Sequence, residues 1–587
     1  MEHTEESNDL NDREKQFTDC VTDLTEGSEN HSLINEANDD PYAYVTRNDF
    51  TSEKFKVEIK NLPKYFGELK KLLNVKLKLN PSKIKLPQNT QRRSWVYVCF
   101  KSEEEKLHAL KTLNNYKWKG LNLKAGEAKP VPDPLVKKRN LACTDEDDKS
   151  KKPKLDNNEL FLKVEDATTP YWQIPYEKQL EKKTHLIEEL LKQYGNKLVK
   201  VNPKVLNWWL LQKAKYNGLP CELFPIKYSD VINGYRNKCE FSIGINKENG
   251  EKTVGFRLGS YAQGSTSVAP VDNVPNVPQQ MKDAAKIFQK FVQNSEYDVF
   301  NYELNQGHWK QLTVRYGFRT KELMIIIGIV PQELTQADLS LIKNNILNYF
   351  VEGEGKLCQV KSLYLQLMKK KRTQNDEVLY EHLFGETYIT EKILGKTFRI
   401  SPQAFFQINT NVAEILYDSI AELSELSKDV TLLDVCCGTG SIGICLSDKC
   451  GEVLGLEISS EAIADAKANA ELNGVNNTQF FSGKAEDILN CVALKATKKE
   501  IIAVVDPPRA GLPLIQIRKN KLIKKLIYVS CDPKAAMKNF LDLGRAASKI
   551  YREEAFLPVK AIPVDLFPHT SHCELVIYFE RIGEDEV

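Results

Sequence analysis

The chain lacks any run of uncharged apolar residues close to the length of about 18 residues that a membrane-spanning helix needs. The first residues lack the basic-then-apolar order of a secretory signal, and residues 1–50 carry 14 Asp or Glu against three Lys or Arg, which argues against a mitochondrial transit peptide. The 13 cysteines are scattered over 587 residues rather than gathered in a disulfide framework, which indicates reduced thiols. We therefore expect a protein of the cytosol, the nucleus or both.

Charge is distributed unevenly along the chain. The overall net charge is +2, but residues 1–50 contribute −11, so the rest of the chain carries +13. A basic body is typical of a protein with a polyanionic partner, although a mild excess over such a length also suits a solvated surface. The length and a hydrophobic content of 41% predict two to four domains. Residues 1–50, polar and without apolar periodicity, are predicted to be a disordered acidic tail.

Residues 53–130 have the periodicity of a small α+β domain. Strand-like alternation occurs at 57–62 and 94–100, and helical patterns occur at 65–74 and 102–114. These segments predict the order βαββαβ.

Two segments of this region carry a specific resemblance. Arg93 to Phe100 resembles the eight-residue consensus of an RNA recognition motif (RRM), and Val57 to Leu62 resembles the shorter consensus. The resemblance implies an RRM-like domain in which Trp95 and Tyr97 stack on RNA bases. Glu58 stands where the shorter consensus usually has an aromatic residue, so protein docking remains an alternative role.

Two further regions lie between this domain and residues 401–587. Residues 131–172 are rich in Pro, Lys, Asp and Asn and are predicted to be a linker. Its clusters at 137–139 and 149–154 resemble a bipartite nuclear import signal, with solvated charge as the alternative. Residues 173–400 mix helical and strand patterns, and the apolar run Ile325 to Ile329 indicates strands buried on both faces. We expect a central α+β domain, whose function the periodicity alone does not indicate.

Residues 401–587 alternate helices with short apolar strands, which predicts an α/β, doubly wound, Rossmann-like domain. The strand Thr431 to Val435 leads into the glycine-rich segment Gly438 to Gly443, where glycines permit a tight turn and close approach of a ligand. Glu457 ends the next strand and is placed to accept hydrogen bonds from the ribose hydroxyls of a nucleoside. Such a loop serves both nicotinamide enzymes and methyltransferases.

The end of the following strand discriminates between reaction types. Asp506 to Gly511 reads Asp-Pro-Pro-Arg-Ala-Gly after the strand Ile501 to Val505. Methyltransferases acting on the adenine amino group carry an aromatic residue where Arg509 stands, and RNA cytosine-5 methyltransferases usually place a cysteine in this motif. Neither chemistry suits this segment.

Cys531 follows the strand Leu526 to Ser530, where a parallel sheet binds its ligands. Carbon 5 of uracil is a poor nucleophile until a thiolate adds at carbon 6, and Cys531 can supply that thiolate. The proton on carbon 5 must then be removed by a base, for which Glu574 is the candidate. Two alternatives stay open, namely His572 as the base, or a metal site of His569, His572 and Cys573, which lacks a second ligand pair.

With these motifs in place, residues 175–580 closely resemble the class I RNA (uracil-5) methyltransferases. The resemblance rests on Ser401 to Asn409, the DPPRAGL segment, YVSCDP and DLFPHTSHCE, which follow one another in that family's order. It implies S-adenosyl-L-methionine as cofactor, Cys531 as nucleophile and Glu574 as proton acceptor. It also implies a cofactor site made of the following residues: Gln407, Cys436, Gly438, Ser441, Glu457 and Asp506.

The resemblance also implies that the central domain, residues 173–400, binds RNA or the substrate. Arg236, in a segment resembling one on the family's substrate side, is a candidate phosphate contact, with a strand-stabilising salt bridge as the alternative. Ribosomal RNA members carry closely spaced iron–sulfur cysteines, and the chain does not reproduce that spacing with Cys143, Cys221, Cys239 and Cys358. We expect neither a cluster nor a metal.

The tRNA branch is therefore favoured. Its animal members combine an RRM with this catalytic region and form 5-methyluridine at position 54 of the T-loop. The implied partner is the T-arm of tRNA, with other RNAs also possible substrates. Three alternatives remain, namely methylation of another RNA uridine, an RNA-binding chaperone or scaffold that keeps the fold without turnover, and a nicotinamide-dependent oxidoreductase.

Overall fold

The computed structural model describes residues 55–63, 68–79, 81–85, 95–100, 102–114, 116–128, 164–258, 267–301, 304–368, 379–509, 511–549, 551 and 553–583. The predicted acidic tail, the two basic clusters at 137–139 and 149–154, Arg93 and Cys143 lie outside these residues. The chain divides into two compact units, Met1–Lys154 and Leu155–Val587. Within the described ranges, no helix is long and apolar enough to cross a membrane.

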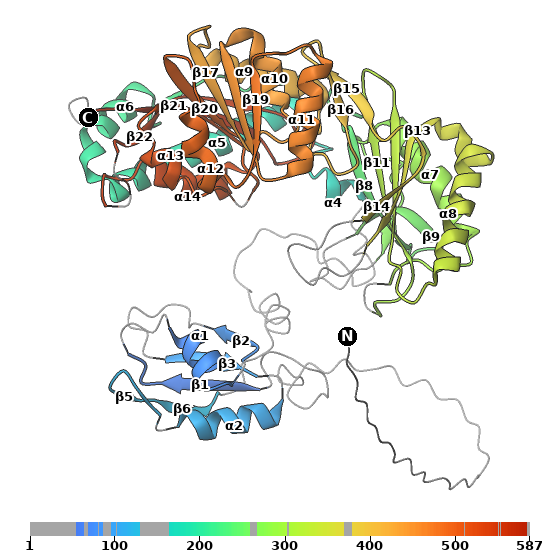
Figure 1. The fold of residues 1–587 in the computed structure, drawn as a ribbon, viewed down its shortest axis with the longest axis horizontal. Helices are drawn as coiled ribbons and strands as arrows, with labels where there is room; N and C mark the ends of the chain where they lie inside the picture. Colours follow the sequence, from blue (N-terminus) through green and yellow to red (C-terminus); the bar gives the residue numbers. More distant parts are fainter. Residues whose placement is uncertain are drawn as a thin grey trace, which may run out of the picture. The chain divides into compact units, whose positions relative to one another are not determined.

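The first unit is built around a four-stranded antiparallel sheet in the order β2-β3-β1-β6 (Figure 1). Its elements are β1 (Lys56–Lys60), α1 (Leu69–Lys71), a π-helical turn η2 (Leu72–Lys76), β2 (Lys83–Lys85), β3 (Trp95–Cys99), α2 (Glu103–Leu113), β4 (Lys117–Trp118), β5 (Leu121–Asn122) and β6 (Lys124–Glu127). Alternate residues of β1 and β3 are buried, among them Ile59 and Val96. The elements follow one another in the predicted βαββαβ order, apart from the short β4–β5 pair.

The second unit begins with α4 (Val164–Thr168), in the stretch predicted as a linker, and contains two large sheets. The first has seven strands in the order β10-β9-β8-β11-β12-β13-β14. Its elements are β8 (Lys238–Ile245), β9 (Lys252–Arg257), β10 (Val268–Ala269), α7 (Gln279–Gln293), β11 (Trp309–Tyr316), β12 (Leu323–Ile329), α8 (Gln336–Val351), η5 (Glu354–Cys358), β13 (Val360–Leu367) and β14 (Leu379–Gly385).

Both faces of this seven-stranded sheet are covered at its centre. Helices α7 and α8 pack on one face through residues such as Phe288 and Ile342, which share a core with Ile325. On the other face, Met324 packs in one cluster with Phe398 of the hairpin β15 (Ile389–Ile393) and β16 (Lys396–Ile400). Every residue of β12 is buried, which confirms the prediction made from its apolar run.

The second large sheet has eight strands in the order β19-β18-β17-β20-β21-β23-β22-β7. Its strands are β7 (Glu222–Leu223), β17 (Val430–Val435), β18 (Glu452–Glu457), β19 (Thr478–Ser482), β20 (Glu500–Val505), β21 (Ile523–Ser530), β22 (Phe556–Val564) and β23 (Glu574–Arg581). The five strands from β19 to β21 are parallel, whereas β23 lies antiparallel between β21 and β22. The sheet is therefore mixed, because the last two strands form a hairpin whose second arm returns beside β21.

Helices cover both faces of the eight-stranded sheet. One face packs against α9 (Thr410–Ser424), α10 (Ser441–Leu446) and α11 (Ser460–Leu472). The other packs against α5 (Tyr176–Val201), α6 (Leu206–Lys215), α12 (Ala485–Ala493), α13 (Ile515–Lys519) and α14 (Pro533–Leu543). Figure 1 shows α12, α13 and α14 together on one side of the sheet and α9 and α10 on the other. The elements α5, α6 and β7 precede the seven-stranded sheet in the sequence, yet they pack with the eight-stranded sheet. The structural unit around the eight-stranded sheet therefore includes residues from both sides of the boundary predicted at residue 400.

A buried ion pair ties α5 to the loop between β22 and β23. The Lys183 ammonium lies 2.6 Å from the Asp565 carboxylate, and neither side chain is exposed. Lys183 also donates to the carbonyl oxygen of Phe567 at 3.0 Å, and the Tyr176 hydroxyl donates to Asp565 at 2.9 Å. Both charged groups thus have further hydrogen bonds besides their own contact, which helps a buried pair to be tolerated.

Lys183→Met tests this anchor. The change leaves the Asp565 carboxylate buried without its cation, so we expect the free energy of unfolding of the second unit to fall by about 3–5 kcal/mol. Urea denaturation followed by tryptophan fluorescence measures the difference. Lys182→Met removes an exposed neighbouring ammonium of the same helix and is the matched control. Equal stability of the two variants would contradict the assignment.

Candidate active site

The glycine-rich turn between β17 and α10 is held against the neighbouring strand. The backbone amides of Cys436 and Cys437 both donate to the carbonyl oxygen of Leu456, at 2.9 and 3.1 Å. Cys436, Gly438 and Gly440 have φ angles of 66°, 53° and 77°, so the turn is left-handed at three positions. The space where a Cβ of Gly438 would lie is open, which leaves the backbone accessible to a ligand.

Glu457, at the end of β18, lies beside this turn. Its carboxylate accepts hydrogen bonds from the backbone amides of Gly438, at 3.3 Å, and Ser459, at 3.1 Å. The side chain is only partly buried, so its remaining acceptor capacity can reach a ligand. The predicted nucleoside-binding acid is therefore placed against the predicted glycine turn.

Ser441 begins α10 and is already engaged within the protein. Its hydroxyl lies 2.7 Å from the hydroxyl of the buried Tyr417 of α9. Nearby, the buried Asp434 carboxylate accepts from the backbone amide of Gly443 at 3.0 Å, and burial raises the pKa of Asp434 to about 7. These two polar contacts connect α9 and β17 to α10.

Gln407 joins the loop before α9 to the end of β20. Its side-chain amide donates to the Asp506 carboxylate at 3.2 Å. Its backbone carbonyl oxygen accepts a hydrogen bond from the side-chain amide of the buried Asn237 at 2.7 Å. Burial raises the pKa of Asp506 above the usual range of a carboxyl group. Asn237, whose role sequence reasoning missed, thus connects the strand β8 to this loop. Phe405 of the same loop is 68% exposed, which leaves an aromatic face open to solvent.

Cys531 and Glu574 face each other across two adjacent strands. In the antiparallel register of β21 and β23, Ser530 pairs with Leu575. One position further along the chain from Ser530 and one position back from Leu575, Cys531 therefore lies opposite Glu574. Cys531 is partly exposed, whereas Glu574 is 2% exposed. The sheet itself thus brings together two residues that are 43 positions apart in the sequence.

Arg509 interacts with both of these residues. Burial and the Glu574 charge raise the pKa of the Cys531 thiol, while a hydrogen bond and the positive charge of Arg509 lower it. Burial and the Asp506 charge raise the pKa of Glu574 well above its ordinary value, and Arg509 acts in the opposite direction. Sequence reasoning noted Arg509 as a departure from other motifs but gave it no role. The signal was its place in the motif that also holds Asp506.

The two histidines of the C-terminal segment lie in different environments. His569 is buried, with one ring nitrogen 3.2 Å from the side-chain amide nitrogen of Gln179 and the other 2.9 Å from the side-chain oxygen of Asn233. His572 is exposed. No group of three His, Cys, Asp or Glu residues suited to a metal ion occurs among the residues that the structure describes.

The predicted RNA contacts lie apart from these residues in the sequence. On β3 of the first unit, Trp95 and Tyr97 are partly exposed and their rings pack edge to face, with centroids 4.9 Å apart. Tyr97 pairs with Glu58 of β1, and the Lys56 ammonium lies 4.7 Å from the Tyr97 ring centroid. In the second unit, Arg236 is partly buried, and the thiol of Cys239 is among its contacts. Its Nε atom is buried without a hydrogen-bond partner in the described structure.

Comparison with known proteins gives consistent matches. The family model described as tRNA (Uracil-5-)-methyltransferase matches residues 355–582. The tRNA (uracil-5-)-methyltransferase homolog A of Mus musculus is 40% identical over 549 residues, covering 92% of this chain and 87% of that protein. The homolog A of Homo sapiens is 38% identical over 547 residues, covering 92% and 85%.

A solved structure also aligns with the chain. It is the Pyrococcus abyssi tRNA (uracil-54, C5)-methyltransferase in complex with S-adenosyl-L-homocysteine, 23% identical, with a TM-score of 0.48, covering 70% of this chain and 84% of that one.

Arg509→Leu tests the electrostatics of this site. Without the hydrogen bond and positive charge of Arg509, the thiol pKa of Cys531 should rise, so the thiolate fraction at a given pH should fall. The rate of Cys531 alkylation by iodoacetamide is measured by mass spectrometry over a range of pH. The midpoint of this pH profile should lie at a higher pH in Arg509→Leu than in the unchanged protein. Arg509→Lys keeps the charge and should shift less. An unchanged profile in Arg509→Leu would show that Arg509 does not act on the thiol.

Proposed function

The chain belongs to the tRNA (uracil-5-)-methyltransferase family, and on that basis we propose that it methylates carbon 5 of the uridine at position 54 in the T-loop of tRNA, with S-adenosyl-L-methionine as the methyl donor. Membership makes the protein a methyltransferase. The observation that carries the finer proposal is the placement of Cys531 opposite Glu574, with Asp506 and Arg509 beside them. A uracil placed between the two strand ends has a thiol on one side and a carboxyl group on the other.

The residues around the glycine turn fit the cofactor. The open backbone at Gly438 and the partly exposed Glu457 carboxylate suit a nucleoside, with Cys436 and Ser441 lining the turn. Gln407 and Asp506 extend this site toward Cys531. Bound S-adenosyl-L-methionine supplies an electrophilic methyl group there.

In the proposed reaction Cys531 acts first. Its thiolate adds to carbon 6 of the uracil, and the electron pair of the double bond between carbons 5 and 6 moves toward carbon 5 and oxygen 4. Arg509 favours the thiolate because its charge and hydrogen bond stabilise the ionised form. Carbon 5 thereby becomes nucleophilic enough to take the methyl group.

Glu574 then completes the reaction. Its carboxylate removes the proton from carbon 5, and the electrons of that bond re-form the double bond as the Cys531 thiolate leaves carbon 6. The raised pKa of Glu574 makes it a stronger base than an exposed carboxylate. Glu574 must be ionised to act, so this step should slow as pH falls through its raised pKa.

The remaining parts of the chain are proposed to serve RNA binding. The antiparallel sheet of the first unit, with Trp95 and Tyr97 outward on β3, supports an RRM-like domain over residues 53–130. Arg236 is proposed to contact phosphate in the central region 173–400, with catalysis in 401–587. We propose cytosol, nucleus or both as the compartment, as the composition predicts.

The reaction is tested by incubating the protein with unmodified tRNA transcript and labelled S-adenosyl-L-methionine, followed by nucleoside mass spectrometry. We expect 5-methyluridine that disappears when the uridine at position 54 is replaced by cytidine. Cys531→Ala should abolish methylation while leaving cofactor affinity unchanged, because the thiol acts on the base alone. Cys573→Ala removes a buried thiol that directly precedes Glu574 in the sequence, and it is the matched control. Methylation by Cys531→Ala would refute the mechanism, and transfer to another nucleotide would refute the site.

Glu574→Gln tests the second half of the mechanism. Thiolate addition and methyl transfer do not need the base, whereas elimination requires loss of the proton from carbon 5. We expect a covalent protein–tRNA adduct that survives denaturing gel electrophoresis and is absent in the double variant with Cys531→Ala. His572→Gln, at the alternative base, should turn over without accumulating the adduct. The opposite pattern would assign proton removal to His572.

A further inference from the structure

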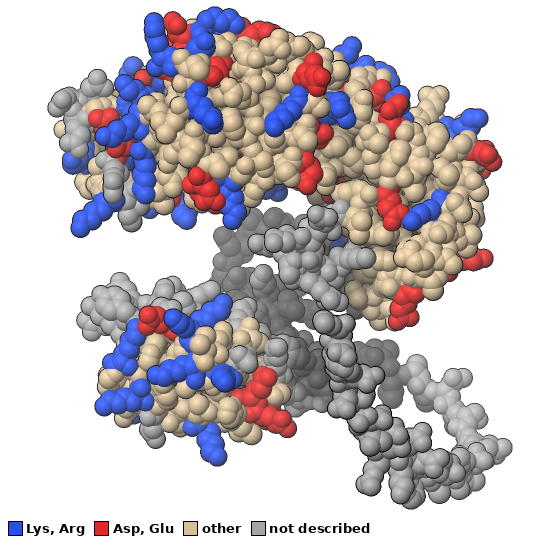
Figure 2. Space-filling model, in the orientation of Figure 1, with Lys and Arg blue, Asp and Glu red and all other residues tan. Residues whose placement is uncertain are grey.

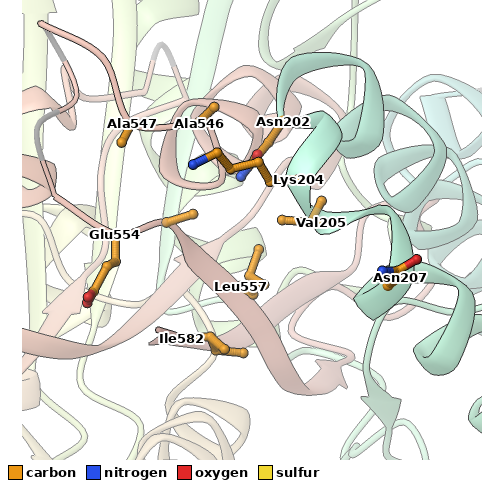
Figure 3. A pocket seen from close by; sticks show the side chains of 10 residues that line it. Asn202, Lys204, Val205, Asn207, Ala546, Ala547, Glu554, Leu557 and Ile582 are labelled. Carbon is orange, nitrogen blue, oxygen red and sulfur yellow. The ribbon is translucent and has the colours of Figure 1, made fainter. Parts of the chain in front are cut away.

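A cavity of about 350 Å³ lies at the end of the eight-stranded sheet opposite to the catalytic strand ends. Leu557 stands near the beginning of β22 and Ile582 follows the end of β23, whereas Glu574 begins β23. Figure 3 shows Asn202 and Lys204 along one side of the cavity and Leu557 and Ile582 along the other. None of the catalytic residues lines this cavity, so it is separate from the methylation site.

Asn202 contributes a buried polar group whose bonding is incomplete. The residue is 4% exposed, and its side-chain amide donates to the carbonyl oxygen of Gly544 at 3.1 Å. Its side-chain oxygen is buried without a hydrogen-bond partner in the described part of the chain. A buried acceptor without a partner costs free energy, which a ligand that donates an N–H group would recover. The cavity therefore combines apolar residues with two groups that accept hydrogen bonds, the Asn202 side-chain oxygen and the Glu554 carboxylate.

The cavity wall carries one cation and one carboxylate, Lys204 and Glu554, and the chain segment that contains Lys204 is rich in lysine. Residues 190–221 contain six lysines and no Asp, Glu or Arg. Among them Lys200, Lys204 and Lys213 are exposed, on the end of α5, the turn η3 (Pro203–Val205) and α6. Lys521 lies 3.9 Å from Glu553, so its charge is offset by that carboxylate. Figure 2 shows Lys and Arg outnumbering Asp and Glu at the end of the molecule that carries α6.

We propose that this cavity binds an unpaired nucleobase of the tRNA substrate at a point outside the methylated loop, while the surrounding lysines hold its phosphates. A nucleobase has flat apolar faces that suit Val205, Leu557 and Ile582, and N–H donors at its edge that suit Asn202. Phosphates provide the charge that the lysines complement. The inference rests on the proposed function, because it assigns a second contact to the same RNA.

The length of α5 decides which part of the RNA reaches the cavity. The helix runs from Tyr176, which bonds to the loop preceding Glu574, to Val201 beside the cavity. Its 26 residues span roughly 39 Å at 1.5 Å per residue. A T-arm hairpin engaged at Cys531 therefore leaves the cavity for another part of the full-length tRNA.

The first test compares Lys204→Glu with Lys467→Glu, a matched charge reversal at an exposed lysine of α11. Fluorescence anisotropy gives the affinities for full-length tRNA transcript and for the isolated T-arm hairpin at several salt concentrations. Lys204→Glu should weaken binding of full-length tRNA by roughly fivefold and lower its salt slope by about one, with hairpin binding unchanged. Equal effects of the two variants, or an equal loss for both RNAs, would overturn the proposal.

The second test locates the base directly. Ultraviolet crosslinking of the full-length tRNA complex, followed by peptide mass spectrometry, should join a nucleotide outside the T-arm to residues 202–207 or 553–557. Asn202→Ala should lower this crosslink relative to crosslinks near Cys531. Crosslinks confined to the region of Cys531 would contradict the proposal. Neither test requires methyl transfer, so a chain that binds and crosslinks as expected without forming 5-methyluridine would overturn the proposed function alone.

Discussion

The antiparallel pairing of β23 with β21 is the constraint on which the candidate site depends. A purely parallel sheet would leave the first residue of β23 at the opposite end from Cys531, because parallel strands all end on the same side. Reversal of the last strand brings its first residue, Glu574, to the end of β21. The hairpin that carries this reversal is fixed from outside the sheet by the buried pair of Lys183 and Asp565. A helix from early in the chain thus helps to set the position of a residue near its end.

The electrostatics of the site depend on Arg509, a single cation that acts on both Cys531 and Glu574. Asp506, Cys531 and Glu574 all have raised pKa values, because burial disfavours their charged forms; at Cys531 and Glu574 the neighbouring negative charges raise the pKa further. Arg509 opposes this effect at both Cys531 and Glu574. The proposed reaction needs a thiolate at its start and an ionised carboxylate at its end, and Arg509 favours the charged form of both groups.

The two ends of the eight-stranded sheet differ in what they offer RNA. The end carrying Cys531 holds Glu574 and the glycine turn, and the opposite end holds a cavity lined by Lys204 and Glu554 within a lysine-rich segment of the chain. Helix α5 connects the two ends and also supplies Lys183. Its first half therefore contacts the loop of the hairpin that carries Glu574, and its second half belongs to the lysine-rich segment.

The sequence by itself determined the local elements and the motifs of this protein. Periodicity located strands such as β12 and β17, and motif order identified the family and the candidates Cys531 and Glu574 before any contact was known. It did not give the antiparallel place of β23, the return of α5 and β7 to the catalytic sheet, the action of Arg509 on the thiol, or the cavity beside Asn202. Periodicity and motifs are read from residues close in sequence, whereas strand order and burial depend on residues hundreds of positions apart. Only the tertiary structure decided those.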